Sequence, residues 1–212
     1  VDGGIPGPFT GNDRANLSDK GFRLQDTHVG EIRLSSVELR NFGGEIYYVG
    51  GMGPDWQYLD DCHFHGSPQC AFNPGGTGRL MATNLRAGRA YQAAEIIGGK
   101  GHTYTNARFY DAGRGGMTVF GGPSPGFRSG YPYWFALWDG KGSPPWVTFD
   151  GATFERCRPL RIGAWMRGRI TTIDTSVGLA LDQGHVRDID LVVDSRCDRD
   201  TNFEAVSIGG PK

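Results

Sequence analysis

The chain has 212 residues, of which 35 are glycine and 12 are proline, with 12% aromatic residues, 38% hydrophobic residues and a formal net charge of −1. The glycine content, roughly twice the usual ~7%, excludes long helices, because each interior glycine costs ~1 kcal/mol relative to alanine. The aromatic content excludes a disordered chain, the near-zero charge gives no basic footprint for a nucleic acid, and no run of ~18 apolar residues predicts a membrane span.

In chain order, residues 1–28 are expected to form an irregular N-terminal segment or cap, and residues 29–210 carry a repeat. Glycine pairs fall at 50–51, 75–76, 98–99, 121–122 and 209–210, with lone glycines at 163 and 184. The spacing is regular, at the short period typical of repeat architectures, apart from one step of nearly twice that length between 121 and 163. The long step holds residues 123–146, which are rich in proline and aromatic residues and are expected to form an inserted loop.

Apolar or small residues recur in step with the glycines, at offsets 0, 3, 5 and often 8. Offsets 3 and 5 differ by two, so those side chains share one face of a strand. Degenerate or weaker copies begin at Leu80 and Ile170. The clearest copies are Leu34, Val37, Leu39 and Phe42; Leu59, Cys62 and Phe64; Tyr104, Ala107, Phe109 and Ala112; and Phe149, Ala152, Phe154 and Cys157.

No repeat of this length buries its apolar face alone, whereas stacked repeats do. The sequence therefore predicts an all-β protein, a right-handed parallel β-helix (solenoid) of about seven coils, each of roughly 21–25 residues. A leucine-rich repeat is excluded, because neither its leucine signature nor a helix is present. A β-propeller is excluded because its blades need ~40 residues, more than this repeat has. Cys62, Cys157 and Cys197 lie in apolar phase and are expected to be free thiols, and Cys62 with Cys70 is the one local pair that could form a disulfide.

Two stretches, IRLSSVELRNFGG (32–44) and VTFDGATFERC (147–157), resemble coils of the pectin-lyase-like superfamily of right-handed parallel β-helices. Pectate lyases, polygalacturonases, alginate epimerases and phage tailspikes belong to it, and the resemblance covers about residues 30–210. The polygalacturonase motifs are not present as a set, because Asp60-Asp61 has no correctly spaced Gly-His-Gly partner. The Asp-Pro-His-Asp motif of epimerases and the clustered acids of a pectate-lyase calcium site are also missing.

Tailspikes share this fold without a common catalytic motif, so the resemblance favours a tailspike-like domain that binds polysaccharide of the bacterial surface, with glycan cleavage as an open possibility. A free-standing polysaccharide lyase, glycoside hydrolase or epimerase is the alternative, and a structural spacer without activity is another. Tailspikes are typically homotrimers, so the resemblance implies a homotrimer at the virion surface or outside the cell. Because the chain starts without the helix that usually caps a β-helix, we expect partner chains to cover its ends or the chain to be part of a longer polypeptide. No cofactor is implied.

A polar row on the outward side of the strands is the first candidate site. Alternation places Asp61, His63 and His65 on one outward row, flanked by residues of the neighbouring coils ~4.8 Å away. In this groove a carboxylate would act as general acid or base and arginine would bind an acidic sugar. A solvated strand face is the plainer interpretation. The predicted catalytic residues are Glu38, Asp61, His63, His65 and Arg86, and the predicted glycan-binding residues of the row are Arg40, Arg108 and Tyr110.

Within that row, Glu38 and Asp61 are the carboxyl pair whose stacked positions best fit the roughly 5–9.5 Å separation of glycoside hydrolases. His63 and His65 could also hold a metal together with Asp61, but no third ligand is defined, so no metal site is predicted.

The aromatic residues of the insertion are the second candidate site. Tyr131, Tyr133, Trp134 and Trp138 are predicted to bind glycan, because aromatic rings offer rigid apolar area to sugars. Folding of this loop back onto the solenoid, or a contact between subunits, is the competing interpretation.

Overall fold

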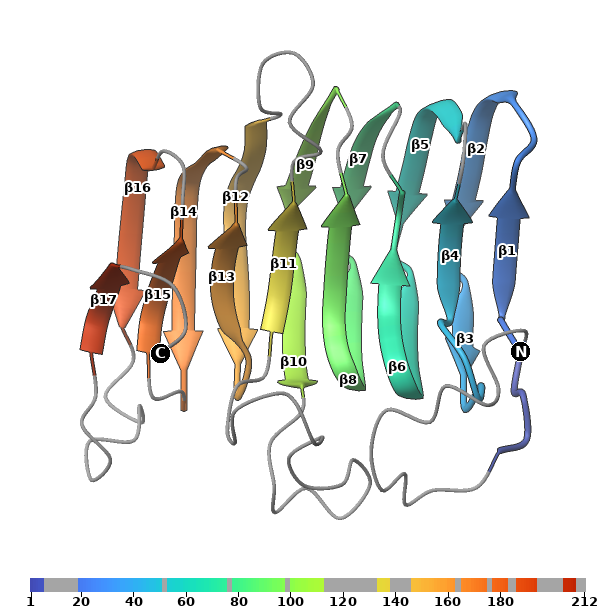
Figure 1. Cartoon of the computed structure of the whole chain (residues 1–212), viewed down its shortest axis with the longest axis horizontal. Coiled ribbons are helices and arrows are strands. Elements are labelled where there is room, and N and C mark those ends of the chain that lie inside the picture. The colour runs from blue at the N-terminus through green and yellow to red at the C-terminus, as the bar shows by residue number, and fades with distance from the viewer. Residues whose placement is uncertain are drawn as a thin grey trace.

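The computed structural model describes residues 1–5, 19–50, 53–75, 78–97, 100–112, 133–137, 146–162, 165–174, 177–182, 186–193 and 204–208. The described part is all-β and forms a parallel β-solenoid, which confirms the predicted fold class. Figure 1 shows its strands side by side along one long axis. Within these residues no helix is long and apolar enough to span a membrane.

The strands form three faces, which we number in the order in which the chain first passes through them. Face 1 contains the strands that lie toward the viewer in Figure 1. It consists of β1 (Phe22–Gln25), β4 (Tyr47–Gly50), the second half of β6 (His63–Asn73), the second half of β8 (Arg86–Ile97), β11 (Tyr133–Leu137), β13 (Arg158–Ile162), β15 (Val177–Asp182) and β17 (Glu204–Ile208).

Faces 2 and 3 follow in each turn and meet at a sharp corner. Face 2 consists of β2 (Val29–Ser35), β5 (Pro54–Asp60), β7 (Arg79–Thr83), β9 (Gly101–Thr105) and the first halves of β12 (Trp146–Glu155), β14 (Trp165–Ile173) and β16 (Val186–Val193). Face 3 consists of β3 (Glu38–Arg40), the first halves of β6 and β8, β10 (Arg108–Ala112) and the second halves of β12, β14 and β16.

The strand register confirms the predicted period. Leu39 pairs with Phe64, and Phe64 pairs with Ala87, so each turn advances the chain by the interval that the glycine pairs predict. Phe109 then pairs with Phe154, which is the predicted long step. About five turns are described along most of their course, against about seven expected, because several corners toward the C-terminus lie outside the described residues.

Two segments differ from their predicted character. β1 lies inside residues 1–28 and pairs with β4, so regular β-structure begins earlier than expected. β11 lies inside the predicted insertion 123–146, yet it pairs with β8 and β13 as a member of face 1. The run of aromatic residues in β11 has high β-propensity, which favours a strand over a loop.

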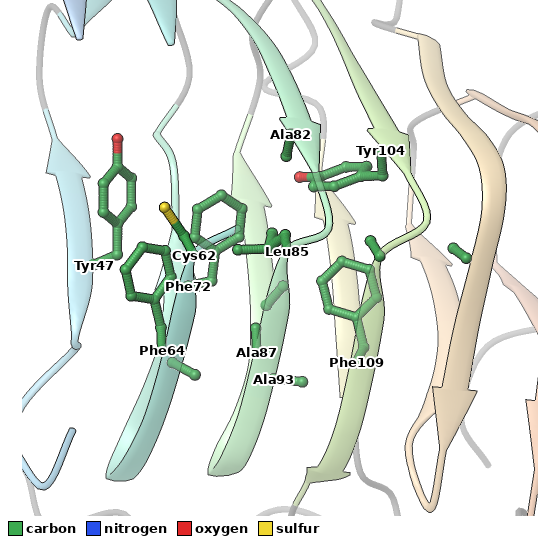
Figure 2. Packing of buried hydrophobic residues seen from close by; sticks show 14 of the residues in the cluster. Tyr47, Cys62, Phe64, Phe72, Ala82, Leu85, Ala87, Ala93, Tyr104 and Phe109 are labelled. Carbon is green, nitrogen blue, oxygen red and sulfur yellow. The ribbon is translucent and has the colours of Figure 1, made fainter. Parts of the chain in front are cut away.

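The core lies between the three faces and is built from aromatic rings with small residues between them (Figure 2). Tyr47 stacks on Phe22 and Phe72, with ring centroids 4.9 and 5.2 Å apart. Phe109 stacks on Phe154 at 5.1 Å. Cys62 is a buried free thiol, as predicted, and Cys70 is also free, so the local pair forms no disulfide. Cys157 is buried, and Cys197 lies outside the described residues. The predicted inward offsets therefore form the core.

The corner between faces 2 and 3 has a left-handed backbone conformation in four successive turns. Ser36, Asp61, Asn84 and Asn106 occupy this corner in successive turns, with φ between 48° and 54°. Asparagine and aspartate tolerate this conformation better than other non-glycine residues. The Asn106 amide also donates to Asn84 Oδ1 at 2.7 Å, which links one turn to the next. Polar corner residues therefore allow the chain to turn between strands, the role that the sequence analysis predicts for glycine.

The core contains a buried histidine. His102 of β9 is 2% exposed between its register partners Leu80 and Val147, and its Nδ1 atom has no hydrogen-bond partner among the described residues. Burial lowers the pKa of His102 from its ordinary 6.5 to about 4. The folded protein thus holds this histidine neutral at a pH where the unfolded chain protonates it.

We expect His102→Leu to weaken the pH dependence of stability between pH 6.5 and about 4. In that window the unfolded chain binds the extra proton, so acidification destabilises the fold by up to about 1.4 kcal/mol per pH unit for one histidine. Above pH 6.5 the imidazole is neutral in both the folded and the unfolded state, so proton binding to it no longer lowers the stability. Urea unfolding at several pH values measures it, with exposed His28→Gln as the control. Parallel curves for the wild type and His102→Leu would contradict this expectation.

Candidate functional site on face 3

The outward side of face 3 carries a continuous polar surface across successive strands. Alternation along β3, β6, β8 and β10 turns every second side chain away from the core. The register places one outward column over Glu38, His63, Arg86 and Arg108, and a second over Arg40, His65, Gly88, Tyr110 and Glu155. The structure therefore brings together all the predicted strand residues of the groove except Asp61.

Glu38, His63, His65 and Tyr110 form the centre of this surface, which we call the His–Glu–Tyr cluster. His65 Nε2 donates to Glu38 Oε1 at 2.9 Å, and His63 Nδ1 lies 3.8 Å from the same oxygen. The two imidazole rings stack with centroids 4.1 Å apart. His63 Nε2 lies 2.6 Å from the Tyr110 hydroxyl oxygen. The cluster thus joins β3, β6 and β10.

Tyr110 reaches His63 across β8 because Gly88 lies between them without a side chain. A Cβ atom added to Gly88 would lie 2.1 Å from the Tyr110 backbone oxygen and 2.7 Å from Cδ1 of its ring. The tyrosine ring therefore occupies the space that any larger residue at position 88 would fill. His65, the cross-strand partner of Gly88, is 7% exposed although its strand position faces outward.

Burial and neighbouring charges set the protonation states of the cluster. Burial lowers the pKa of His63 from 6.5 to about 4 and lowers the pKa of His65 as well, so both imidazoles are neutral near pH 7. The hydrogen bond from His65 lowers the pKa of Glu38, which is ionised. Burial raises the pKa of Tyr110 to about 12, so its hydroxyl is protonated and donates to neutral His63.

Arginines surround the cluster, and three of them have a carboxylate partner, while Arg89 adds a positive charge that helps to lower the pKa of His63 and His65. Arg40 Nε lies 3.0 Å from Asp2 Oδ2, and Arg108 contacts Glu155 while its guanidinium lies 5.2 Å from the centroid of the Tyr110 ring. Arg86 lies 3.6 Å from Asp61, and both side chains are about half exposed. An exposed pair at that distance contributes at most about 1 kcal/mol, so Arg86 can exchange Asp61 for another anion.

Asp61 does not lie in the outward row where alternation predicted it. It occupies the corner between faces 2 and 3, with φ of 48°, because the chain bends there before β6 begins. Its carboxylate contacts Arg86, whereas Glu38 contacts the two histidines. The structure thus gives no support to Glu38 and Asp61 as a hydrolytic pair, and the acid beside the histidines is Glu38.

Only some of the aromatic residues predicted to bind glycan in the insertion are among the described residues. Tyr133 and Trp134 begin β11, and their backbone pairs with Gln92 and Ala94 of β8. Tyr131 and Trp138 lie outside the described residues. Glycan binding by these four residues stays a prediction.

Residues beyond those predicted also belong to this surface. Asp2 contacts Arg40 and Asn41 from the N-terminal segment, and Arg156 contacts Asp111 and Glu155 beside Tyr110. Arg156 and Asp111 occupy the corner after face 3, with φ of 49° and 51°. Only a pattern of polar residues one or two positions beyond the offset-5 residue could have indicated them. No sequence signal connects Asp2 to a strand so distant along the chain.

Face 2 carries a second outward set that the sequence did not reveal. Trp56 and Tyr58 stack with ring centroids 5.5 Å apart, and the Arg33 and Arg79 guanidiniums lie 4.3 and 5.3 Å from the Tyr58 and Trp56 ring centroids. These arginines are the cross-strand partners of the two rings. Because the guanidiniums already cover the rings, this set serves first as a stabilising ladder between strands.

Comparison of the chain with protein-family models, with curated proteins and with solved structures finds no match.

Proposed function

We propose that this protein binds an acidic polysaccharide along face 3. The observation that carries the proposal is the row of arginines on β3, β8 and β10 around the His–Glu–Tyr cluster. Adjacent strands lie ~4.8 Å apart, so the row offers guanidiniums repeatedly along the solenoid axis. A polymer with repeated carboxylates complements such a row, because guanidinium groups bind carboxylates with two parallel hydrogen bonds. Arg86, with its weak and exposed pairing, is the first contact.

A second candidate function, cleavage of the same glycan by β-elimination, is favoured by the His63–Tyr110 contact. In this step the Tyr110 hydroxyl turns from His63 Nε2 to the glycosidic oxygen, and the freed Nε2 takes the proton next to the uronate carboxylate, whose growing negative charge Arg86 stabilises. The electron pair forms the carbon–carbon double bond and expels the glycosidic oxygen, which takes the Tyr110 hydroxyl proton. Transfer of the proton from His63 to the phenolate then restores both groups. β-Elimination needs one base within hydrogen-bond reach of the proton that is removed and one acid within reach of the departing oxygen.

Glycoside hydrolysis is less well supported at this surface. It requires one carboxylic acid that stays protonated, which needs a raised pKa. The hydrogen bond from His65 lowers the pKa of Glu38, and Arg108 and Arg156 lower the pKa of Glu155. Both carboxyl groups are therefore ionised and suited to holding cations rather than donating protons.

We extend the proposal to a surface-recognition protein of the tailspike kind, a homotrimer or part of a longer chain, at the virion surface or outside the cell. The parallel solenoid and the exposed arginine row on one face are compatible with this arrangement. Sedimentation equilibrium tests the trimer. A monomer would count against the tailspike assignment and favour a free-standing lyase, and a trimer that binds no glycan would favour a structural spacer.

We expect Arg86→Gln to weaken binding of an acidic polysaccharide about tenfold, the loss of one charge-assisted contact worth about 1.4 kcal/mol. Calorimetric titration with a panel of purified bacterial capsular polysaccharides, acidic and neutral, measures the affinity. Arg33→Gln is the matched control, because Arg33 is also an exposed arginine paired with a carboxylate, that of Glu31, but lies on face 2. Equal losses in both variants, or equal affinity for neutral glycans, would overturn the proposed surface.

Cleavage is measured in the same samples by the ultraviolet absorbance of the unsaturated product, which we expect to be absent in Tyr110→Phe.

A further inference from the structure

We propose that Glu38, His63 and His65 form a binding site for a divalent transition metal ion. Each residue offers one ligand atom, and the three atoms lie within 4.8 Å of one another. This inference goes beyond polysaccharide binding and does not depend on it, because metal binding is measured on the protein alone.

The strand geometry holds the three ligands in place. His63 and His65 are alternate residues of β6, so both side chains leave the same side of the strand, and Glu38 is the direct cross-strand partner of His63. The separations from Glu38 Oε1 are 2.9 Å to His65 Nε2 and 3.8 Å to His63 Nδ1. Ligand atoms of a tetrahedral zinc site with bonds of ~2.0–2.1 Å lie about 3.3 Å apart, which falls between these two separations. Small side-chain adjustments therefore complete the site.

The hydrogen bond between Tyr110 and His63 matches what a metal requires. Tyr110 accepts from His63 Nε2 once Nδ1 holds the ion, reversing the direction of their present hydrogen bond without moving either ring. A hydrogen bond of this kind to the far nitrogen fixes the tautomer and orientation of a metal-bound histidine. His65 Nδ1 is buried and has no partner among the described residues, so this support is given to His63 and not to His65.

The charges around the site are compatible with a cation. Arg40, Arg86 and Arg108 contact Asp2, Asp61 and Glu155 respectively, which offset part of their positive charge. Arg40 also lies 3.9 Å from Glu38 Oε1, and Arg89 adds a further positive charge near the two histidines. The Glu38 side chain is 49% exposed, so an ion reaches the site from solvent and keeps coordination positions open toward it. An anionic ligand at an open position would also face the arginine row. Two imidazoles with one carboxylate select zinc, cobalt or iron over calcium and magnesium, which prefer oxygen ligands alone.

The test is calorimetric titration of Zn²⁺ into chelator-treated, untagged protein, with the visible absorption of Co²⁺ as a second readout. We expect one ion per chain. Glu38→Gln, which preserves shape, and His65→Asn are expected to weaken Zn²⁺ binding more than about 100-fold, and Tyr110→Phe about tenfold. The control is the double variant His28→Gln and Glu31→Gln. It removes an exposed histidine just before β2 and an exposed glutamate within β2, both away from face 3.

No stoichiometric Zn²⁺ binding, or unchanged affinity in Glu38→Gln with retained circular dichroism, would overturn the metal site. Loss of affinity in the control variant would also overturn it, because the ion would then lie elsewhere. Zn²⁺ binding without polysaccharide binding supports the metal site and overturns the proposed function. Polysaccharide binding without Zn²⁺ binding supports the proposed function and overturns the metal site.

Discussion

Replacement of Phe109 by alanine is expected to destabilise the protein by about 3–5 kcal/mol, the usual cost of removing a fully buried phenylalanine. The Phe109 ring is 0% exposed, stacks on Phe154 and meets the edge of Tyr104. Its cross-strand partner on the other side is Ala87, which is too small to close the cavity left behind. Urea unfolding followed by tryptophan fluorescence and circular dichroism measures the change.

Tyr58→Ala is the matched control for this experiment. Tyr58 is also an aromatic residue on a central strand, but its ring lies on the outward side of face 2, between Trp56 and Arg33. Its removal creates no buried cavity and is expected to cost about 1 kcal/mol, the worth of one or two such ring contacts. If the two variants unfold at the same urea concentration, the proposed role of the aromatic core is wrong.

Gly88→Ala is expected to destabilise the protein by about 3 kcal/mol, at the upper end of the usual cost of overpacking, and to disrupt the His–Glu–Tyr cluster. The added Cβ would lie 2.1 Å from the Tyr110 backbone oxygen, so β8 and β10 must separate. The Tyr110 ring is displaced with its strand and loses its contact with His63. We therefore expect binding of Zn²⁺ and of acidic polysaccharide to fall by at least as much as in Tyr110→Phe. Urea unfolding and the two titrations measure these effects.

Gly30→Ala provides the control for Gly88→Ala. Gly30 lies in β2 with nothing within 4 Å of an added Cβ, and its φ is outside the left-handed region. We expect it to be tolerated with unchanged binding. A Gly88→Ala protein as stable as Gly30→Ala, with both ligands bound normally, would show that Tyr110 does not need the space above residue 88.

Much of the fold could be predicted from the sequence, because each turn repeats the same local requirements. The inward positions of Leu39, Phe64 and Phe109 follow from alternation, and their spacing follows from the length of one turn. The strand at Tyr133–Leu137 could not be separated from its surroundings, because an aromatic run fits both a buried strand and a binding loop.

The candidate site was predicted less well than the fold. Glu38, His63 and Tyr110 were placed on one surface by alternation, but Asp61 was misplaced because the chain bends at that residue. A single residue in the left-handed conformation changes the direction of the chain, and alternation counts assume that no such residue intervenes. The partnership of His65 with Glu38 rather than Asp61 depends on that bend.

The sequence by itself determined the solenoid, its repeat period and the inward apolar residues, since these are local properties that each turn repeats. Only the tertiary structure decided that Tyr110 crosses over Gly88 to reach His63 and that Asp2 meets Arg40. These contacts join residues that lie far apart along the chain, and no periodic pattern encodes them. The glycine excess of the chain thus has two physical roles: it permits the corners of the stack, and at Gly88 it leaves the space in which the candidate site is assembled.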